Sequence, residues 1–426
     1  MATPASGMAG ELARPARLQS IDLLRGLVMV FMALDHVRDF FTHLRFAPEN
    51  MSQTYAGLFL TRFVTHYSAP TFFLLAGTGA YLYGRTRTKA EVSHFLWTRG
   101  LFLVVMEFTV IWWGWSFMFP FPGLGMIVIW ALGMSMICLS LLIKLPMKAI
   151  AAFSLILIAG HNLTDKVTPA MFGKLSWLWM ILHQQGFYAI TSKPVGPKLP
   201  PLGFFVAYPL VPWIGVMSAG YLLGGLYMKP AEERRKVLLG IGLACCLLFV
   251  ILRATNLYGN AGGAGVTGAG GFALGSEGPF SVQGTTEKTI IKFFNVHKYP
   301  PSLDFLLVTL GPALVLLSWA EGFDFKGALG KLLHPVVVIG KVPMFYYICH
   351  LYLIHVMALV AALAFGQPWK WLLHGGFFMN PIPLGYGHNL PFIWMIWALC
   401  VAILYLPCRW YAQYKATHKA KWLSYI

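Results

Sequence analysis

Charged residues are scarce in this chain of 426 amino acids. They make up 11% of the sequence, while 58% of the residues are hydrophobic; a soluble domain typically carries roughly 25% charged residues. A globular core could not bury so many apolar side chains, so a water-soluble fold is excluded and lipid must be the solvent for most of the chain. The composition predicts an all-α, polytopic bundle of transmembrane helices.

Patterns that would bind a metal, a nucleotide or a nucleic acid are also missing. The six cysteines show no metal-ligand spacing, and we interpret them as core thiols. One stretch, from Gly263 to Gly268, matches G-x-G-x-x-G, but it is not set between a strand and a helix, so we expect a flexible loop. The basic residues behind the net charge of +17 are spread through short connections, which argues against a nucleic-acid partner. We expect no metal site, and neither a hydrolase nor an ATPase signature is present.

Long apolar runs dominate the rest of the sequence. Nine of them can cross about 30 Å of hydrocarbon at about 1.5 Å per residue. A tenth is shorter, so we predict ten spans and leave an eleventh helix open. The predicted spans cover residues 20–41, 56–84, 93–114, 124–143, 147–161 (the short one), 204–228, 235–254, 302–321, 341–365 and 390–412.

Lysine and arginine are concentrated in every second connection between these runs. Cytoplasmic loops carry such an excess, so both termini are predicted to face the cytoplasm. The N-terminal segment has no apolar h-region, so we expect no cleaved signal peptide. The predicted segments are a cytoplasmic N-terminal segment (1–19), an integral-membrane domain (20–412) with exoplasmic loops near 162–203 and 255–301, and a basic cytoplasmic tail (413–426). A Trp-rich stretch at 175–188 is predicted to lie as an interfacial helix.

The first span is the richest in ionisable side chains, which are costly within lipid unless paired or wetted. Asp22 and Arg25, three residues apart, are predicted to form a structural ion pair. His36 lies fourteen residues after Asp22, or about 21 Å along a helix, and is a candidate general base.

Three charged neighbours surround His36 in the sequence. Asp35, Arg38 and Asp39 are predicted to form an ion network that orients the imidazole, with Asp35 as part of the catalytic group. An alternative for Arg38 and Asp39 is that they only end the helix at the exoplasmic interface.

Other spans carry further candidates. His66 is either catalytic or a structural hydrogen-bonding residue, and Glu107 is predicted to be a buried structural counter-ion. His350 and His355 diverge by about 140° around a helix, so one of them is expected to serve the site and the other an interhelical bond. Two prolines, Pro209 and Pro212, are predicted to break or kink the sixth span.

Several sequence patches resemble a known family. The stretch RLQSIDLLRG at 17–26 and its spacing to His36 look like the opening of integral-membrane acyltransferase-3 proteins. The closer resemblance is to bacterial relatives of heparan-alpha-glucosaminide N-acetyltransferase. That resemblance rests on ALDHVRDFF, HYSAPTFFLLAGT, PLVPWIGVMSAGY, KYPPSLDFLLVTLGPA and GKVPMFYYICHLYLIH, at 33–41, 66–78, 209–221, 298–313 and 340–355.

The resemblance implies a bacterial inner-membrane enzyme that takes an acyl group from cytoplasmic acyl-CoA, such as acetyl-CoA. The acceptor would be a glycan or amino sugar, acylated at an amine or a hydroxyl on the exoplasmic side. Arg25, Arg99 and Lys341 lie near the cytoplasmic face, where CoA phosphates would enter. His36 would deprotonate the acceptor or carry the acyl group transiently, with His350 as a further catalytic candidate.

One position departs from the lysosomal enzyme, which has Asn where this chain has His36 and a proposed active-site His further along. His43 is the nearest match here, offset by four residues, so the choice between His36 and His43 stays open. A proton-coupled transporter or flippase is the alternative function, because intramembrane ionisable groups also describe such carriers. The oligomeric state is open as well, with a homodimer among the alternatives.

Overall fold

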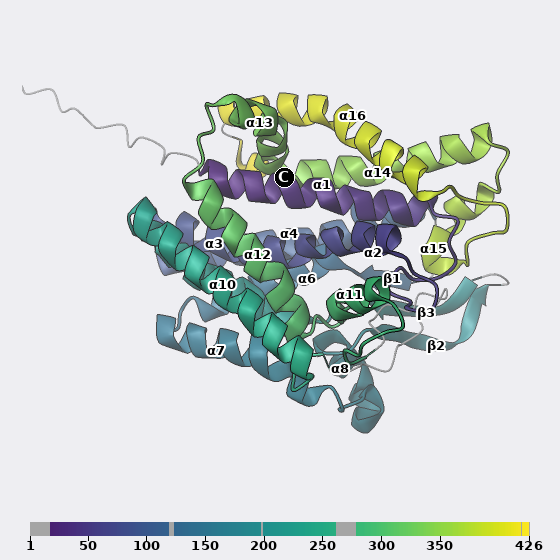
Figure 1. Ribbon diagram of the computed structural model, residues 1–426, viewed down its shortest axis with the longest axis horizontal. Helices are drawn as coiled ribbons and strands as arrows, with labels where there is room; N and C mark the ends of the chain where they lie inside the picture. Colours follow the sequence, from purple (N-terminus) through teal and green to yellow (C-terminus); the bar gives the residue numbers. More distant parts are fainter. Residues whose placement is uncertain (1–17, 119–122, 197–198, 261–277, 419, 426) are drawn as a thin grey trace, which may run out of the picture.

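The computed structural model describes residues 18–118, 123–196, 199–260, 278–418 and 420–425. It is 73% helical, which confirms the predicted all-α membrane bundle. Most of the predicted segment 1–19 and the stretch from Gly263 to Gly268 lie outside the described residues. The start of α1 (Gln19–Phe41) and the end of α16 (Leu390–Thr417) lie at the same end of the molecule (Figure 1), as the prediction for the termini requires.

Seven of the described helical stretches are long and apolar enough to cross a membrane. They correspond to seven of the ten predicted spans. These stretches are α4 with a π-helical turn and α5 (Lys89–Ser116), α7 with its 3-10 extension (Met147–Thr164), α9 with its extension (Leu210–Met228), α10 (Ala231–Thr255), α12 (Leu303–Glu321), α14 (Pro343–Ala364) and α16.

The other three predicted spans are helical but differ in character. α1 carries Asp22, Arg25 and Asp35 within its length. The second span is divided into α2 (Ala56–Phe63) and α3 (Ser68–Tyr83) by a 3-10 turn, and α6 (Val128–Leu142) has only 15 residues. An additional helix, α13 (Ala328–Lys341), precedes α14.

Large apolar side chains cover the outside of the bundle. Leu155 on α7, Leu247 on α10 and Leu406 on α16 are each more than 60% exposed. Such a surface is stable only against lipid. The chain is a multi-pass membrane protein.

Glycines allow the tightest helix contacts. A Cβ added to Gly77 on α3 would lie 1.9 Å from the carbonyl oxygen of Met217, and one added to Gly220 on α9 would lie 1.9 Å from that of Leu74. Backbones that approach this closely pack without intervening side chains, as in other membrane helix pairs.

The prediction that two prolines kink the sixth span is wrong. Pro209 is the N-cap of α9 and Pro212 lies in its first turn. The amides of a first helical turn have no partner within the helix, so proline is tolerated there without a kink. The two prolines mark where the helix begins.

The long connections are folded as well. α8 (Ser176–Leu182) covers only part of the predicted interfacial helix, because Phe187 and Tyr188 belong to strand β2 (Gly186–Gly196). β2 pairs antiparallel with β3 (Leu199–Val206), which pairs parallel with β1 (Gly123–Met126). The sheet lies at the same end of the molecule as α11 (Thr286–Phe294) and α15 (Gly376–Met379), away from the start of α1 (Figure 1).

Candidate active site

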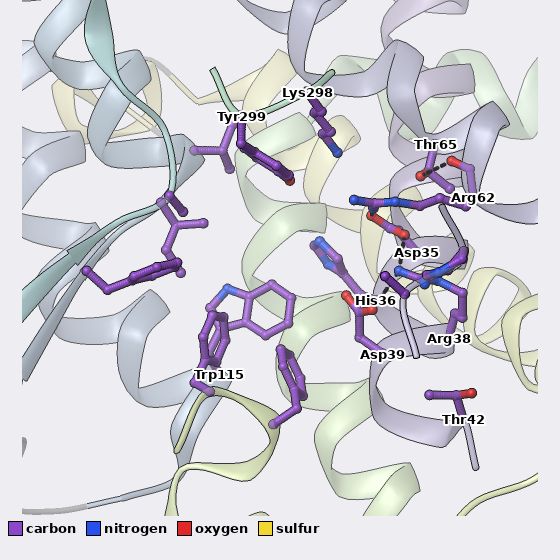
Figure 2. A pocket seen from close by; sticks show the side chains of 18 of the residues that line it. Asp35, His36, Arg38, Asp39, Thr42, Arg62, Thr65, Trp115, Lys298 and Tyr299 are labelled. Atoms are coloured by element: carbon purple, nitrogen blue, oxygen red, sulfur yellow. Dashed lines mark hydrogen bonds and ion pairs between the residues drawn. The ribbon is translucent and has the colours of Figure 1, made fainter. Parts of the chain in front are cut away.

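A cavity of about 650 Å³ opens at this end of the bundle. Its volume lies within the usual range of small-molecule sites. Side chains from the last three turns of α1, the loop 42–49, α2, the sheet, α14 and α15 line it, together with Lys298 and Tyr299 before α12. Figure 2 shows Asp35, His36 and Arg62 on one side of the cavity and Trp115 and Tyr299 on others.

His36 is oriented by a second histidine. Its Nδ1 lies 2.7 Å from Nε2 of His350 on α14, and Nδ1 of His350 lies 3.0 Å from the carbonyl oxygen of Tyr346. A carbonyl only accepts, so His350 donates from Nδ1 and, when neutral, accepts at Nε2. His36 therefore donates from Nδ1, and its Nε2 keeps the lone pair. The ring points into the cavity (Figure 2), so this lone pair is a base available to a ligand.

Aromatic rings hold the His36 imidazole on its other sides. Trp115 meets it edge-on with ring centroids 4.5 Å apart, and Tyr347 does so at 6.3 Å. Trp115 is on α5, directly after the π-helical turn Glu107–Ile111. A π-helical turn adds a residue to the helix and rotates every later side chain about the helix axis, so this turn decides that Trp115 faces the cavity.

An ion network forms the wall beside His36. Asp35 pairs with Arg38 at 2.8 Å and with Arg62; Arg38 also binds Asp39 at 2.7 Å, and Arg62 binds Glu49 at 2.8 Å. The predicted network of Asp35, Arg38 and Asp39 is therefore present. It does not orient the imidazole as predicted, because both Asp35 oxygens are bound by arginines and His350 takes the orienting position.

Glu49 is the network member that lies in the loop after α1. Burial alone would raise the pKa of its carboxyl group, but the Arg62 guanidinium and the nearby His66 more than offset this, so the pKa lies well below its usual range. Glu49 is thus ionised at neutral pH and anchors the loop to α2.

His43 and His66, two of the predicted catalytic candidates, do not line the cavity. His43 is exposed, and its Nδ1 donates to the carbonyl oxygen of His388, 2.7 Å away. His66 is buried behind the ion network, with Nε2 3.8 Å from an oxygen of Glu49. Of the candidate histidines, the structure brings His36 and His350 together.

Two further residues have structural roles. His355 lies between the carbonyl oxygens of Gly114 and Leu372, so of the two diverging histidines it is the one that joins helices. Glu107 has no Arg or Lys partner in the described part of the chain, contrary to its predicted role as a counter-ion. It accepts instead from the backbone amide of Trp130 at 2.9 Å, where the first turn of α6 has free amides.

The three cations predicted to bind CoA lie at the opposite end of the bundle. Arg25 contacts Asp22 at 3.4 Å, which confirms that ion pair, and the carbonyl oxygen of Gly340 at 3.3 Å. Arg99 is near enough to Arg25 for their charges to interact, and Lys341 directly follows Gly340. None of the three lines the cavity.

Residues that the sequence did not single out complete the cavity. Trp115, Tyr347 and Lys298 all line it. The position of Lys298 in the sequence could have marked it as a candidate, because it precedes a span on the side where the positive-inside rule predicts few cations. Trp115 and Tyr347 had none, since aromatic residues are common throughout such spans.

Comparison with known proteins places this site in a family. The family model described as heparan-alpha-glucosaminide N-acetyltransferase, catalytic, matches residues 17–255, which is more than half of the chain. A search of curated proteins returned no match. The matched region holds His36, the ion network and Trp115, whereas Lys298 and His350 lie beyond it. The chain belongs to the heparan-alpha-glucosaminide N-acetyltransferase catalytic family.

Proposed function

We propose that this protein is an integral-membrane acyltransferase that moves an acetyl or other acyl group from acyl-CoA to an amine or hydroxyl of a sugar acceptor. The observation that carries the proposal is the free Nε2 of His36, fixed by His350 at the wall of a cavity large enough for a sugar. Family membership supports acyl transfer as the reaction class. The position of the cavity, at the end away from the termini, supports an acceptor on the exoplasmic side.

The proposed reaction needs one base. The acceptor amine or hydroxyl attacks the thioester carbonyl carbon, and His36 Nε2 takes its proton. The carbonyl electrons move onto oxygen and form a tetrahedral intermediate. When the carbonyl re-forms, the carbon–sulfur bond breaks and the CoA sulfur receives the proton from His36. A transient acyl-imidazole on the same nitrogen is the alternative order of events.

The donor is proposed to enter from the cytoplasmic end. Arg25, Arg99 and Lys341 gather there and are suited to bind phosphates. Met32 is the cavity residue nearest to them on α1, and seven residues separate it from Arg25, about 10 Å of helix. An extended thioester arm would cross that distance, with the phosphates held on the cytoplasmic side of a bacterial inner membrane.

Release of CoA by detergent-purified protein, with acetyl-CoA and a panel of amino sugars, tests this proposal. His36→Ala is expected to lose about 100-fold or more of the turnover, because a general base contributes 10²–10⁴-fold. His350→Leu removes the acceptor for His36 Nδ1–H and is expected to cost about tenfold to 100-fold, matching a lost buried hydrogen bond of about 1–3 kcal/mol.

His43→Ala is the matched control, since His43 is exposed and outside the cavity. It should keep the turnover of the wild type. If the His43 variant loses turnover and the His36 variant does not, the assignment of the base is wrong. A wild type that neither binds nor cleaves acetyl-CoA with any acceptor would favour the transporter.

A further inference from the structure

Lys298 is a buried cation, and no carboxylate among the described residues forms an ion pair with it. Only 6% of its surface is exposed, yet in the described part of the chain no carboxylate or other acceptor bonds to its Nζ. The side chain lies against the ring of Tyr299, whose centroid is 5.1 Å from Nζ. Burying an ammonium group without a partner is costly.

Three buried arginines in the described part of the chain differ from Lys298, because each has hydrogen-bonding partners. Arg38 and Arg62 pair with carboxylates, and Arg253 donates to three backbone carbonyls. Lys298 differs because it lines the cavity. Figure 2 shows its amine directed into the space above His36, beside the hydroxyl of Tyr299. The unpaired ammonium of Lys298 therefore lies at the position where a ligand in the cavity would contact it.

The backbone around Lys298 holds this position firmly. The amide of His297 donates to Asn260 at 2.8 Å, the amide of Ser302 donates to the carbonyl of His297 at 2.9 Å, and that of Leu303 donates to Asn162 at 2.9 Å. The segment is tied to both neighbouring connections, which fixes the backbone position from which the Lys298 side chain enters the cavity.

The carboxylates near Lys298 are paired with arginines instead. Asp35, Asp39 and Glu49 are the acidic residues of the cavity wall, and each is bound by Arg38 or Arg62. A negative charge that appears in the cavity would meet Lys298 as a buried cation that no carboxylate holds. Acyl transfer generates such a charge on the carbonyl oxygen.

We propose that Lys298 stabilises the oxyanion of the tetrahedral intermediate during acyl transfer. This rests on the proposed function. As the nucleophile adds, the carbonyl π electrons move onto oxygen, and the Lys298 ammonium donates a hydrogen bond to it without giving up its proton. When the carbon–sulfur bond breaks, the electrons return to the carbonyl and Lys298 is free again. A preorganised donor of this kind typically contributes about 10²–10³-fold to kcat.

Lys298→Met tests the inference, because it keeps the length of the side chain and removes the charge. We expect kcat to fall about 100-fold or more, with little change in KM for either substrate. Lys298→Arg should recover part of the loss. Lys370→Met is the matched control: Lys370 is exposed and does not line the cavity, and loss of its charge should change kcat by less than about threefold.

Thermal unfolding of the same variants gives a second readout. Removal of an unpaired buried charge is expected to leave the melting temperature of Lys298→Met equal to or above that of the wild type. A lower melting temperature would show a structural role and overturn the proposal. A rise in acceptor KM without a fall in kcat would do the same, since Lys298 would then bind the acceptor. An equal loss of kcat in Lys370→Met would also overturn the proposal.

Failure of the two proposals can be told apart in this assay. A wild type that releases CoA while Lys298→Met is equally active defeats the role of Lys298 alone. A wild type that neither binds nor cleaves acetyl-CoA with any acceptor defeats the acyltransferase proposal, and the role of Lys298 with it.

Discussion

Glu49 connects the loop after α1 to the ion network, and its carboxylate makes the stability of the fold depend on pH. Its pKa is lower in the folded protein than its ordinary value of 4.5. Stability from this group is therefore fully present above pH 4.5 and is lost as pH falls below it, because the unfolded chain then binds a proton that the folded chain does not.

Glu49→Gln is expected to lower the free energy of unfolding at pH 7 by about 3 kcal/mol, the lower end of the cost of breaking a buried ion pair. The difference between wild type and variant should shrink as pH falls from about 5 towards about 3. Melting of both detergent-solubilised proteins across this range measures it. A difference that stays constant with pH would contradict the assigned role of Glu49.

His36 and His350 could both be singled out from the sequence, whereas the contact between them could not. An ionisable side chain inside an apolar run is visible in a single sequence. The contact with His350 joins residues 314 positions apart, and no local pattern encodes it. For the same reason His43 and His66 could not be separated from His36 before their positions in the fold were known.

The packing of α3 against α9 depends on which glycines of α3 face α9. Gly77 and Gly79 are two residues apart on α3, and they meet different surroundings. A Cβ at Gly77 would overlap a backbone oxygen of α9, whereas a Cβ at Gly79 meets nothing within 4 Å. The same substitution should therefore act in opposite directions at the two positions.

Gly77→Ala is expected to destabilise the protein by about 1–3 kcal/mol, because the helices must move apart. Gly79→Ala should be neutral or stabilise by up to about 1 kcal/mol through helix propensity. Thermal unfolding in detergent compares them directly. Equal melting temperatures for the two variants would show that α3 and α9 are not packed backbone to backbone.

The sequence predicted where helices occur better than where they break. Apolar length alone placed α10, α12, α14 and α16. The 3-10 turn at Val64–Tyr67 and the π-helical turn at Glu107–Ile111 lie inside continuous apolar runs, so hydropathy did not reveal them. Tertiary contacts decide both, and these are the turns that bring His66 behind the ion network and Trp115 into the cavity.

For the whole molecule, the distribution of lysine and arginine predicts which side faces the cytoplasm and which side is exoplasmic. Ser281 lies in the connection before α11, on the predicted exoplasmic side, and Lys331 lies at the start of α13, on the predicted cytoplasmic side; both are exposed. A membrane-impermeant maleimide should label Ser281→Cys in spheroplasts and label Lys331→Cys only after permeabilisation.

The wild type serves as the background for this labelling, since its six cysteines are buried or half-buried and unpaired. Labelling of Lys331→Cys in sealed spheroplasts would show the opposite orientation, with the cavity beside His36 on the cytoplasmic side. Labelling of both variants would contradict a single orientation.

The pairing of His36 with His350 also bears on how the protein becomes active during synthesis. α1 leaves the ribosome first, but the imidazole that contacts His36 belongs to α14, which is made after more than three quarters of the chain. A truncated chain that ends before α14 would insert its early helices and still hold His36 in an unfixed orientation. Under the proposed function, an unfinished chain would therefore lack the group that orients its base.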